Sequence, residues 1–267
     1  MGSHAIINIT PPRFASLPGL LLAAALGFTL ASCPVFGSGT FAWPAPPLPP
    51  GANPATIATP RVEWFTHFQN NLDQSKKMPA IDLLFDGDSI TDYWMGKGRA
   101  IWEKHYGKLN PFDFGISGDK TENVLWRLQN GQADNLHPKL VAIMIGTNEI
   151  GLPAPQLAEG VKAVVDAYRS RCPEAVILVQ GIFPRGQSPA DPMRARVTAV
   201  NQLISQIADG KNVLYIDFGD KFLQPDGTIS PEIMPDFLHP AAKGYEIWAN
   251  AIQSIIDRYF PAPSSSK

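Results

Sequence analysis

Three side chains with the chemistry of a nucleophile, a base and an orienting acid stand at two places in the chain. Ser89 comes shortly after the apolar run 81–85, and a serine at a tight turn between a strand and a helix is displayed at the end of a sheet. Asp236 and His239 are three residues apart, close enough for the carboxylate to hold the imidazole in one tautomer. Together they predict nucleophilic catalysis by serine. The alternative for Ser89 is helix capping, a common role for serine.

Two further loops carry groups that could bind a negatively charged oxygen. Asn148 follows the apolar run 140–145, and its amide is a donor that a loop can direct at an oxyanion. Gly118 lies in the string FGISGD, where a glycine exposes its backbone N–H. The alternative for Asn148 is a turn-forming role, which is common for asparagine after a strand.

The remaining histidines in the body of the chain lack an acidic partner at such a spacing. His67, His105 and His137 stand among polar or helix-surface residues, so a surface or structural role is the simplest interpretation of each. His239 is therefore the candidate base.

Asp86 and Asp88 offer a competing chemistry. They superficially resemble the aspartate pair that follows the first strand of haloacid-dehalogenase-type phosphatases, in which Asp86 would be the nucleophile and Mg²⁺ the cofactor. Against this interpretation, Thr91 stands one position late, and no acidic metal-ligand pair follows a later strand. The serine mechanism, which needs no metal, is the preferred prediction.

The elements that must position these groups follow a regular pattern from residue 61 onward. Short uninterrupted apolar runs alternate with helical patterns, which is typical of a parallel sheet covered on both faces. We therefore expect one α/β domain in three layers, an α/β/α sandwich with a parallel central sheet. Ligands of such sheets bind at the carboxyl ends of the strands. The strands are predicted at 81–85, 140–145, 175–179 and 213–216, and the helices at 61–77, 123–128, 156–171, 192–208 and 241–259.

The motifs taken together resemble the SGNH, or GDSL-like, hydrolase family over about Ile81 to Tyr259. The longer strings FGISGDKTENVLWRLQNG, IGTNE and DFLHPAAKGY are most similar to the platelet-activating-factor acetylhydrolase catalytic subunits and to bacterial carbohydrate acetylesterases. Asp86 departs from the family pattern, in which an apolar residue is expected, and adds a negative charge near the nucleophile. The four signature blocks stand here as Gly87-Asp88-Ser89, Gly118, Gly146-Thr147-Asn148 and Asp236-Phe237-Leu238-His239.

The resemblance implies a flavodoxin-like fold and an esterase that requires no metal or organic cofactor. Ser89 would attack an ester carbonyl, His239 would take and return the proton, and Asp236 would orient His239. The N–H groups of Ser89 and Gly118 and the side-chain amide of Asn148 would form the oxyanion hole.

The resemblance further implies short acyl esters as substrates, of small molecules or of polysaccharide. O-acetyl groups on extracellular carbohydrate are the preferred prediction, and a phospholipid or platelet-activating-factor-type ester is the alternative. A non-catalytic surface binding module is a third possibility, because fold alone does not establish activity. Four tryptophans could either stack on sugars or pack in the core: Trp94, Trp102, Trp126 and Trp248.

The first sixty residues differ from the rest, with no charged residue between Arg13 and Arg61. Residues 17–31 form an apolar run typical of a secretory signal peptide, which we place at 1–33. Leu30-Ala31-Ser32-Cys33 resembles the lipobox of bacterial lipoproteins, so Cys33 is a possible lipidation site, with ordinary cleavage or an uncleaved anchor as the alternatives. Residues 34–60 are predicted to be a proline-rich spacer. We expect an exported, extracytoplasmic hydrolase domain at 61–260, followed by a tail at 261–267.

Composition excludes several other classes of protein. The chain of 267 residues has 22 basic and 24 acidic residues, a formal net charge of -2, and a pI of about 6.2. Binding to nucleic acid needs a clustered basic surface, which this balance argues against. The two cysteines cannot by themselves build a disulfide framework or a zinc site. A membrane would be a partner only through a lipid anchor at the N-terminus.

Overall fold

Five short strands form one parallel sheet within residues 48–261, which are the residues that the computed structural model describes. The strands lie in the order β2-β1-β3-β4-β5, and every neighbouring pair is parallel. This order places a topological switch point at β1 and β3, where ligands bind in doubly wound sheets. The strands are β1 (Leu83–Gly87), β2 (Pro111–Asp113), β3 (Leu140–Met144), β4 (Val176–Gln180) and β5 (Val213–Ile216).

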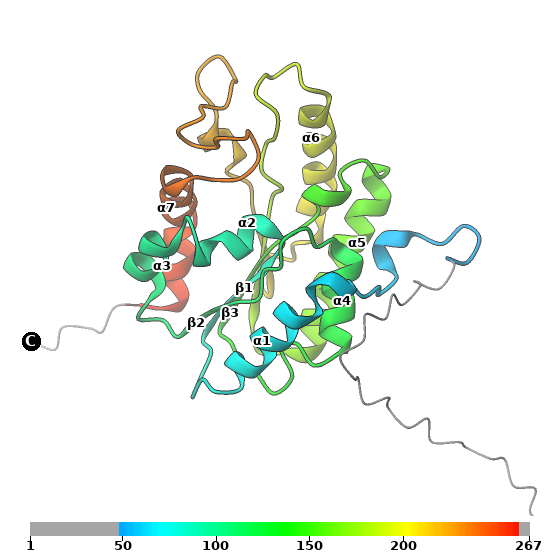
Figure 1. Cartoon of the computed structure of the whole chain (residues 1–267), viewed down its shortest axis with the longest axis vertical. Helices are drawn as coiled ribbons and strands as arrows, with labels where there is room; N and C mark the ends of the chain where they lie inside the picture. The colour runs from blue at the N-terminus through cyan, green and yellow to red at the C-terminus, as the bar shows by residue number, and fades with distance from the viewer. Residues whose placement is uncertain (1–47, 262–267) are drawn as a thin grey trace, which may run out of the picture. The chain divides into compact units, whose positions relative to one another are not determined.

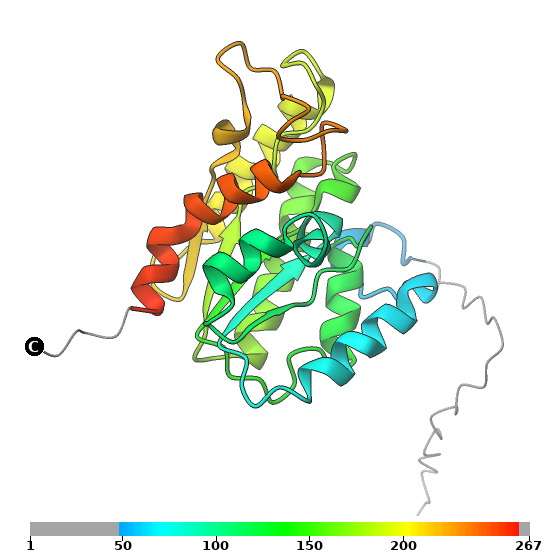
Figure 2. The same ribbon diagram turned by 60° about the vertical axis from the view of Figure 1, so that its left-hand side comes forward.

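The central strands β1 and β3 are buried along their whole length. Successive side chains of a strand point to opposite sides, so each strand contributes to the core on both faces of the sheet. Leu84 of β1 packs in one apolar cluster, whereas Leu83 and Phe85 pack in the other. Helices α1, α4 and α5 cover one face and α3 and α7 the other, as the two views show (Figure 1, Figure 2). The helices are α1 (Phe65–Ser75), α2 (Ser89–Asp92), α3 (Arg99–Tyr106), α4 (Thr121–Gln129), α5 (Ala154–Arg171), α6 (Pro192–Ile204) and α7 (Ala242–Tyr259), with short 3-10 segments at Pro54–Thr56, Val62–Trp64, Tyr93–Met95, Thr147–Glu149, Ser205–Ile207 and Gly219–Phe222.

The predicted three-layer α/β/α sandwich with a parallel central sheet is confirmed. The four predicted strands and five predicted helices all occur, with ends that differ by a few residues. The sequence analysis did not predict strand β2 or the helices α2 and α3. Strand β2 has only three residues and begins with Pro111, which a sheet tolerates here because β2 lies at its edge. Helix α2 has four residues and α3 eight, too short for a clear helical period.

The described end of the predicted spacer packs against the domain. Asn53 caps the 3-10 turn Pro54–Thr56, and the Ala55 side chain is fully buried. The Ala55 carbonyl accepts a hydrogen bond from Thr121 Oγ1 of α4 at 2.7 Å. Asn53 Nδ2 donates to the backbone of α5 at Gln156. Residues 53–60, which were predicted to belong to the spacer, therefore pack against the folded domain.

Several predictions fall on residues that lie outside the described range. They are the signal peptide at 1–33, the lipidation site Cys33, the first part of the spacer and residues 262–267 of the tail. Within residues 48–261, no helix has the length and the apolar character needed to cross a bilayer.

Three of the four tryptophans that could have stacked on a sugar are core residues. Trp94 and Trp248 are fully buried and Trp102 nearly so, in the cluster between the sheet and helices α3 and α7. Trp126 of α4 is half-buried and packs edge-on against Phe68 of α1, with ring centroids 5.4 Å apart. The core-packing interpretation is the correct one for Trp94, Trp102 and Trp248.

Candidate active site

Ser89 is the first residue of α2, directly beyond the carboxyl end of β1. The N-cap of this helix is Asp88, whose Oδ1 accepts the backbone N–H of Ile90 at 2.9 Å. The capping role considered for Ser89 is thus taken by its neighbour, and the Ser89 hydroxyl is left for another partner. That partner is His239 Nε2, which lies 2.8 Å from Ser89 Oγ although 150 residues separate the two in sequence.

Asp236 and His239 form the second part of this hydrogen-bonded chain. His239 Nδ1 lies 2.7 Å from Asp236 Oδ2, while Asp236 Oδ1 accepts the backbone N–H of His239 at 2.7 Å. Burial alone would raise the pKa of Asp236, but these bonds from His239 outweigh it and hold that pKa below its ordinary value. The carboxylate is therefore ionised at neutral pH and fixes a proton on His239 Nδ1, which leaves Nε2 as the acceptor facing Ser89. The structure brings together all three residues predicted from their types and spacing.

The loop before α7 holds His239 by an unusual backbone conformation and a ring contact. Phe237, between Asp236 and His239, has a φ of +57°, which few residues other than glycine adopt. Its carbonyl accepts the N–H of Gly186 at 2.9 Å, which ties the loop to the segment after β4. On the other side, the Tyr93 ring lies against the His239 imidazole with centroids 5.2 Å apart. These contacts limit the rotation of the imidazole.

Residues 114–119, here called the Gly118 loop, lie beside the strand that leads to Ser89. The N–H groups of Phe114 and Ile116 donate to the carbonyls of Phe85 and Gly87, which continues the pairing of β2 with β1. Gly118 has a φ of +80°, a left-handed conformation that favours glycine.

Asn148 is brought to the Gly118 loop from the end of β3. Its Nδ2 donates to the backbone carbonyl of Asp119 at 2.9 Å, so the predicted amide and the predicted glycine loop are in direct hydrogen-bonded contact. Gly146, two residues earlier, has a φ of +125°, a conformation that only glycine adopts without strain. Arg185 Nη1 donates to the Thr147 carbonyl at 2.7 Å and supports the same turn.

Two carboxyl groups next to these motifs are buried and shifted in pKa. Burial raises the pKa of Asp88 to about 7, although its bond from the Ile90 N–H works in the opposite direction. Burial likewise raises the pKa of Glu149 to about 8, against a hydrogen bond from the backbone N–H of Thr121. Both groups adjoin predicted site residues, so part of the polar framework of this site changes its protonation state near neutral pH.

Asp86 is not an exposed charge beside Ser89. It is fully buried, and its two oxygens accept hydrogen bonds from Arg127, Gln132 and Tyr168. Arg127 Nη2 lies 2.9 Å from Asp86 Oδ1, so a positive charge balances the negative one. The phosphatase interpretation, with Asp86 as the nucleophile, is wrong because this carboxylate has no access to a substrate.

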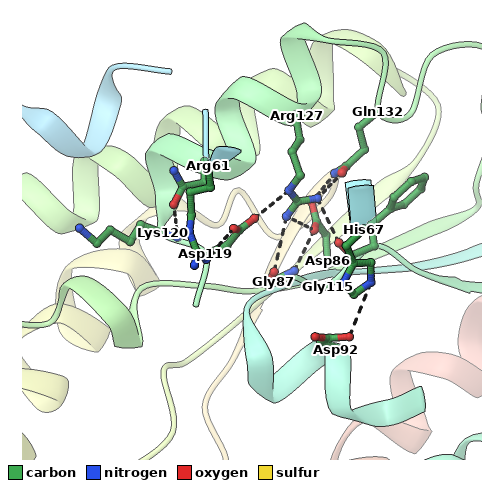
Figure 3. Close-up of polar contacts among 12 residues, drawn as sticks. Arg61, His67, Asp86, Gly87, Asp92, Gly115, Asp119, Lys120, Arg127 and Gln132 are labelled. Carbon is green, nitrogen blue, oxygen red and sulfur yellow. Dashed lines mark hydrogen bonds and ion pairs between the residues drawn. The ribbon is translucent and has the colours of Figure 1, made fainter. Parts of the chain in front are cut away.

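Sequence reasoning missed the charged residues behind and around the Gly118 loop. Arg127 of α4 and Arg61, which precedes α1, both contact Asp119 (Figure 3). Arg127 is only 3% exposed in spite of its charge. The sequence does contain a signal for this residue, because Arg127 stands within the apolar string VLWRL. A charged side chain in such a run is buried only when it is paired with groups of opposite charge.

The other histidines have structural surroundings, as expected. His105 Nδ1 lies 2.9 Å from Gln253 Oε1, with Glu246 beside its other nitrogen. His137 is exposed. The ring of His67 lies 3.9 Å from Asp92, which in turn accepts the hydroxyl of Ser117.

Comparison with known proteins identifies the family. The profile of the GDSL-like lipase/acylhydrolase family matches residues 85–247, which is more than half of the chain. The chain belongs to this family. The human platelet-activating factor acetylhydrolase IB subunit alpha1 is 35% identical over 214 residues, which cover 77% of this chain and 90% of the human one. The rat alpha2 subunit is 39% identical over 184 residues, which cover 68% of this chain and 78% of the rat one.

Solved structures share the fold at lower sequence identity. A GDSL-like lipase from Bacteroides thetaiotaomicron superposes with a TM-score of 0.61 at 17% identity, covering 73% of this chain and 98% of the other. An acetylxylan esterase from Geobacillus stearothermophilus superposes with a TM-score of 0.52 at 22% identity, covering 70% of this chain and 97% of the other. The predicted membership of the SGNH/GDSL-like hydrolases is thereby confirmed, and with it the general class of acylhydrolase.

Proposed function

We propose that this protein is a serine esterase that removes acetyl groups from extracellular carbohydrate. The observation that carries the proposal is the hydrogen-bonded chain from Ser89 Oγ to His239 Nε2 at 2.8 Å and from His239 Nδ1 to Asp236 Oδ2 at 2.7 Å. This is the arrangement that converts a serine hydroxyl into a nucleophile at neutral pH.

The reaction proceeds in two halves. Ser89 Oγ attacks the ester carbonyl while its proton passes to His239 Nε2, and the resulting imidazolium is stabilised by the ionised Asp236. The tetrahedral intermediate collapses, and the leaving alcohol takes the proton from His239, which leaves an acetyl group on Ser89. Water then attacks the acyl-enzyme and gives a proton to His239. The bond between the acetyl carbon and Ser89 Oγ breaks, His239 returns the proton to Ser89 Oγ, and acetate is released.

The developing oxyanion would be bound by the N–H groups of Ser89 and Gly118 and by the Asn148 amide. The Ser89 N–H lies in the first turn of α2, where the backbone donors of a helix are unpaired. Asn148 Nδ2 uses one hydrogen for the Asp119 carbonyl, and its second hydrogen is available for the substrate oxygen. Losing one such donor typically costs roughly 2.7–4 kcal/mol of transition-state stabilisation.

The openness of the site supports a polymer substrate. His239 is 20% and Asp236 54% exposed at the side chain, so the base and its carboxylate lie near the surface rather than in a deep tunnel. An acetyl group that projects from a sugar chain reaches such a site without the chain entering the protein. The structural similarity to an acetylxylan esterase agrees with this substrate class.

A second candidate is an acetylated phospholipid, because the relatives that match at 35–39% identity are platelet-activating factor acetylhydrolase subunits. A direct comparison separates the candidates, with wild type and Ser89→Ala assayed on every substrate. Acetate release is measured with acetylated xylan and with a 2-acetyl phospholipid. Release of p-nitrophenol is measured with p-nitrophenyl acetate and with p-nitrophenyl octanoate below its micelle concentration. We expect Ser89-dependent deacetylation of xylan and faster turnover of the acetyl than the octanoyl ester. A higher kcat/KM for the phospholipid would establish the second candidate. A lack of Ser89-dependent hydrolysis throughout would indicate a binding module.

We further propose that the protein is exported and anchored through Cys33, with the residues between Cys33 and the domain as a spacer. Several acyl chains on one N-terminus anchor a protein stably, whereas one chain binds membranes only marginally. Expression in a bacterium with labelled palmitate should label the wild type and not Cys33→Ser, with esterase activity equal in both. An unlabelled wild type with a mature N-terminus elsewhere would indicate plain secretion.

A further inference from the structure

A charge cluster, buried except for Arg61, surrounds the end of the Gly118 loop and consists of Arg61, Asp86, Asp119 and Arg127, here called the Asp119 cluster (Figure 3). Its centre is Arg127, which is 3% exposed and ion-paired at both ends of its guanidinium. Nη2 lies 2.9 Å from Asp86 Oδ1, and Nε lies 2.8 Å from Asp119 Oδ2. Burial opposes the charge of Arg127, yet the two carboxylates raise the pKa of its guanidinium above the ordinary value.

Arg127 also holds the backbone at the start of the Gly118 loop. Its Nη1 donates to the Phe114 carbonyl at 3.0 Å, and the carbonyl of Gly87, two residues before Ser89, lies 3.5 Å from Nη2. One buried side chain therefore contacts both the strand end that carries Ser89 and the loop that carries Gly118.

Arg61 approaches the same loop from the outer side. Its Nη1 donates to the Ser117 carbonyl at 2.8 Å and to Asp119 Oδ1 at 3.1 Å, so it bonds the residues immediately before and after Gly118. A Cβ at Gly118 would lie 2.8 Å from Arg61 Nη1, which shows how closely the guanidinium covers this residue. Arg61 is 22% exposed at the side chain, unlike Arg127.

Asp119 joins these contacts to Asn148. Its carboxylate is shared between the two arginines, and its backbone carbonyl accepts Asn148 Nδ2 at 2.9 Å. We infer that Asp119, held between Arg61 and Arg127, is the positioning residue that aligns the Gly118 N–H and the Asn148 amide as one oxyanion hole. This inference rests on the proposed esterase function, because it assigns a role within that site.

Two physical effects follow from the arrangement. The first is preorganisation. The Gly118 N–H and the Asn148 amide, which follow β2 and β3, are both held in place through Asp119, so neither has to be ordered when the oxyanion forms. The second is charge balance. A carboxylate without a counter-charge next to the oxyanion hole would repel the developing negative charge. Here the guanidiniums of Arg61 and Arg127 balance the carboxylates of Asp119 and Asp86. Removing Arg61 should therefore harm the transition state more than the ground state.

The experiment uses the full-length protein, with three changes at the accessible residues Arg61 and Glu63 and a fourth, Asp119→Asn, at the buried carboxylate. Arg61→Met removes the outer guanidinium, Arg61→Lys keeps the charge without the paired geometry, and Glu63→Gln is the matched control. Glu63 is paired with Arg61 Nε on the solvent side, at 3.2 Å, and takes no part in holding the loop. The readouts are kcat and KM for p-nitrophenyl acetate, the inhibition constant of a small alkylboronic acid that mimics the tetrahedral intermediate, and the melting temperature.

We expect Arg61→Met to lower kcat roughly 10- to 100-fold with KM within about twofold, because a small misplacement of catalytic donors has effects of this size. Boronic acid binding should weaken by a similar factor, Arg61→Lys should recover part of both, and Glu63→Gln should behave as wild type. Asp119→Asn, which keeps the backbone carbonyl, should also lower kcat, and Arg61→Met should add little to it. Such non-additivity is expected of residues that act through one contact.

The outcomes separate this inference from the proposed function. Absence of Ser89-dependent esterase activity in the wild type would overturn the proposed function itself. With the wild type active, unchanged kcat and boronic acid binding in folded Arg61→Met would overturn the positioning role alone. Parallel losses of kcat and melting temperature without partial recovery in Arg61→Lys would show a purely structural role, and would likewise overturn it.

Discussion

At the scale of single residues, Ser89, His239 and Asp236 are of interest as a hydrogen-bonded unit rather than as three independent groups. Each of the two bonds in the chain has one end on His239, so replacing that residue breaks both. Replacing Ser89 removes the proposed nucleophile at the end of this chain. A unit of this kind loses most of its effect with the first change.

We predict that Ser89→Ala and His239→Ala each lower kcat/KM for p-nitrophenyl acetate by roughly 10³- to 10⁶-fold, with the melting temperature nearly unchanged. The double variant Ser89→Ala/His239→Ala should be no more than several-fold worse than either single one. Initial rates of the four proteins, corrected for the uncatalysed reaction, provide the measurement. Multiplication of the two single losses in the double variant would show that the residues act independently.

The single residue Asp88 makes the stability of the protein depend on pH. Its folded pKa is about 7 against an ordinary 3.8, so the folded protein holds a proton that the unfolded chain releases. The contribution of this group to the free energy of unfolding is fully present below about pH 4. It is lost as the pH rises to about 7. Asparagine at this position keeps the oxygen that accepts the Ile90 N–H and cannot ionise.

We therefore predict that Asp88→Asn loses less stability than the wild type between pH 5 and pH 8, by about 2–3 kcal/mol. Guanidinium unfolding curves at the two pH values measure the difference. Asp73→Asn, at an exposed position of α1, is the control and should follow the wild type. A decline in Asp88→Asn as large as that of the wild type would show that Asp88 is not the group responsible.

At the scale of elements, the turn after β3 decides where the Asn148 amide lies. Gly146 has a φ of +125°, and a Cβ there would lie 2.8 Å from Ile182 Cδ1. Gly151, five residues later, has open space around it and no such backbone constraint. The two glycines therefore form a matched pair within one loop.

We predict that Gly146→Ala lowers the free energy of unfolding by about 1–3 kcal/mol through backbone strain and contact with Ile182. It should also lower kcat, because the turn that carries Asn148 must shift. Gly151→Ala should remain within about 0.5 kcal/mol of the wild type. Equal effects of the two substitutions, in denaturant unfolding and ester hydrolysis, would contradict the assigned role of the turn.

At the scale of the whole molecule, the segment that precedes α1 is part of the fold. Residues 53–60 bond to both α4 and α5, including Asn123 Nδ2 to the Thr59 carbonyl at 2.9 Å. Ala55 packs closely against Gly160 of α5, because a Cβ added at Gly160 would lie 2.6 Å from the Ala55 Cβ. This segment leads directly into Arg61 and so fixes the direction from which Arg61 reaches the Gly118 loop.

We predict that a chain beginning at residue 61 unfolds at a lower denaturant concentration than one beginning at residue 48, with a loss of about 2–4 kcal/mol. A loss of this size corresponds to a few net hydrogen bonds and the burial of one small apolar surface. Point variants provide the check: Ala55→Glu should reproduce much of the loss, and Thr56→Glu, at the neighbouring exposed position, should not. Identical unfolding curves for the two chains would show that residues 48–60 are a passive linker.

The sequence alone determined the layers of the fold and the identity of the main candidate residues. Strand β5 was predicted at the residues where it occurs, and β3 to within one residue. Strands of parallel sheets are short apolar runs, which are recognised in the sequence without knowledge of their partners. Ser89, Asp236 and His239 were recognisable because their residue types, loops and spacing are local properties.

Only the tertiary structure decided which side chains surround these candidates. It showed that Asp88 and not Ser89 caps α2, and that Asp86 is neutralised by Arg127, 41 residues away. It also placed Arg61 on Asp119, 58 residues away. No local pattern contains such pairings, because the energy of a buried charge depends on the partner that the folded chain brings within about 3 Å. Periodicity reports the burial of a segment, whereas the pairing of charges is set by how distant segments pack.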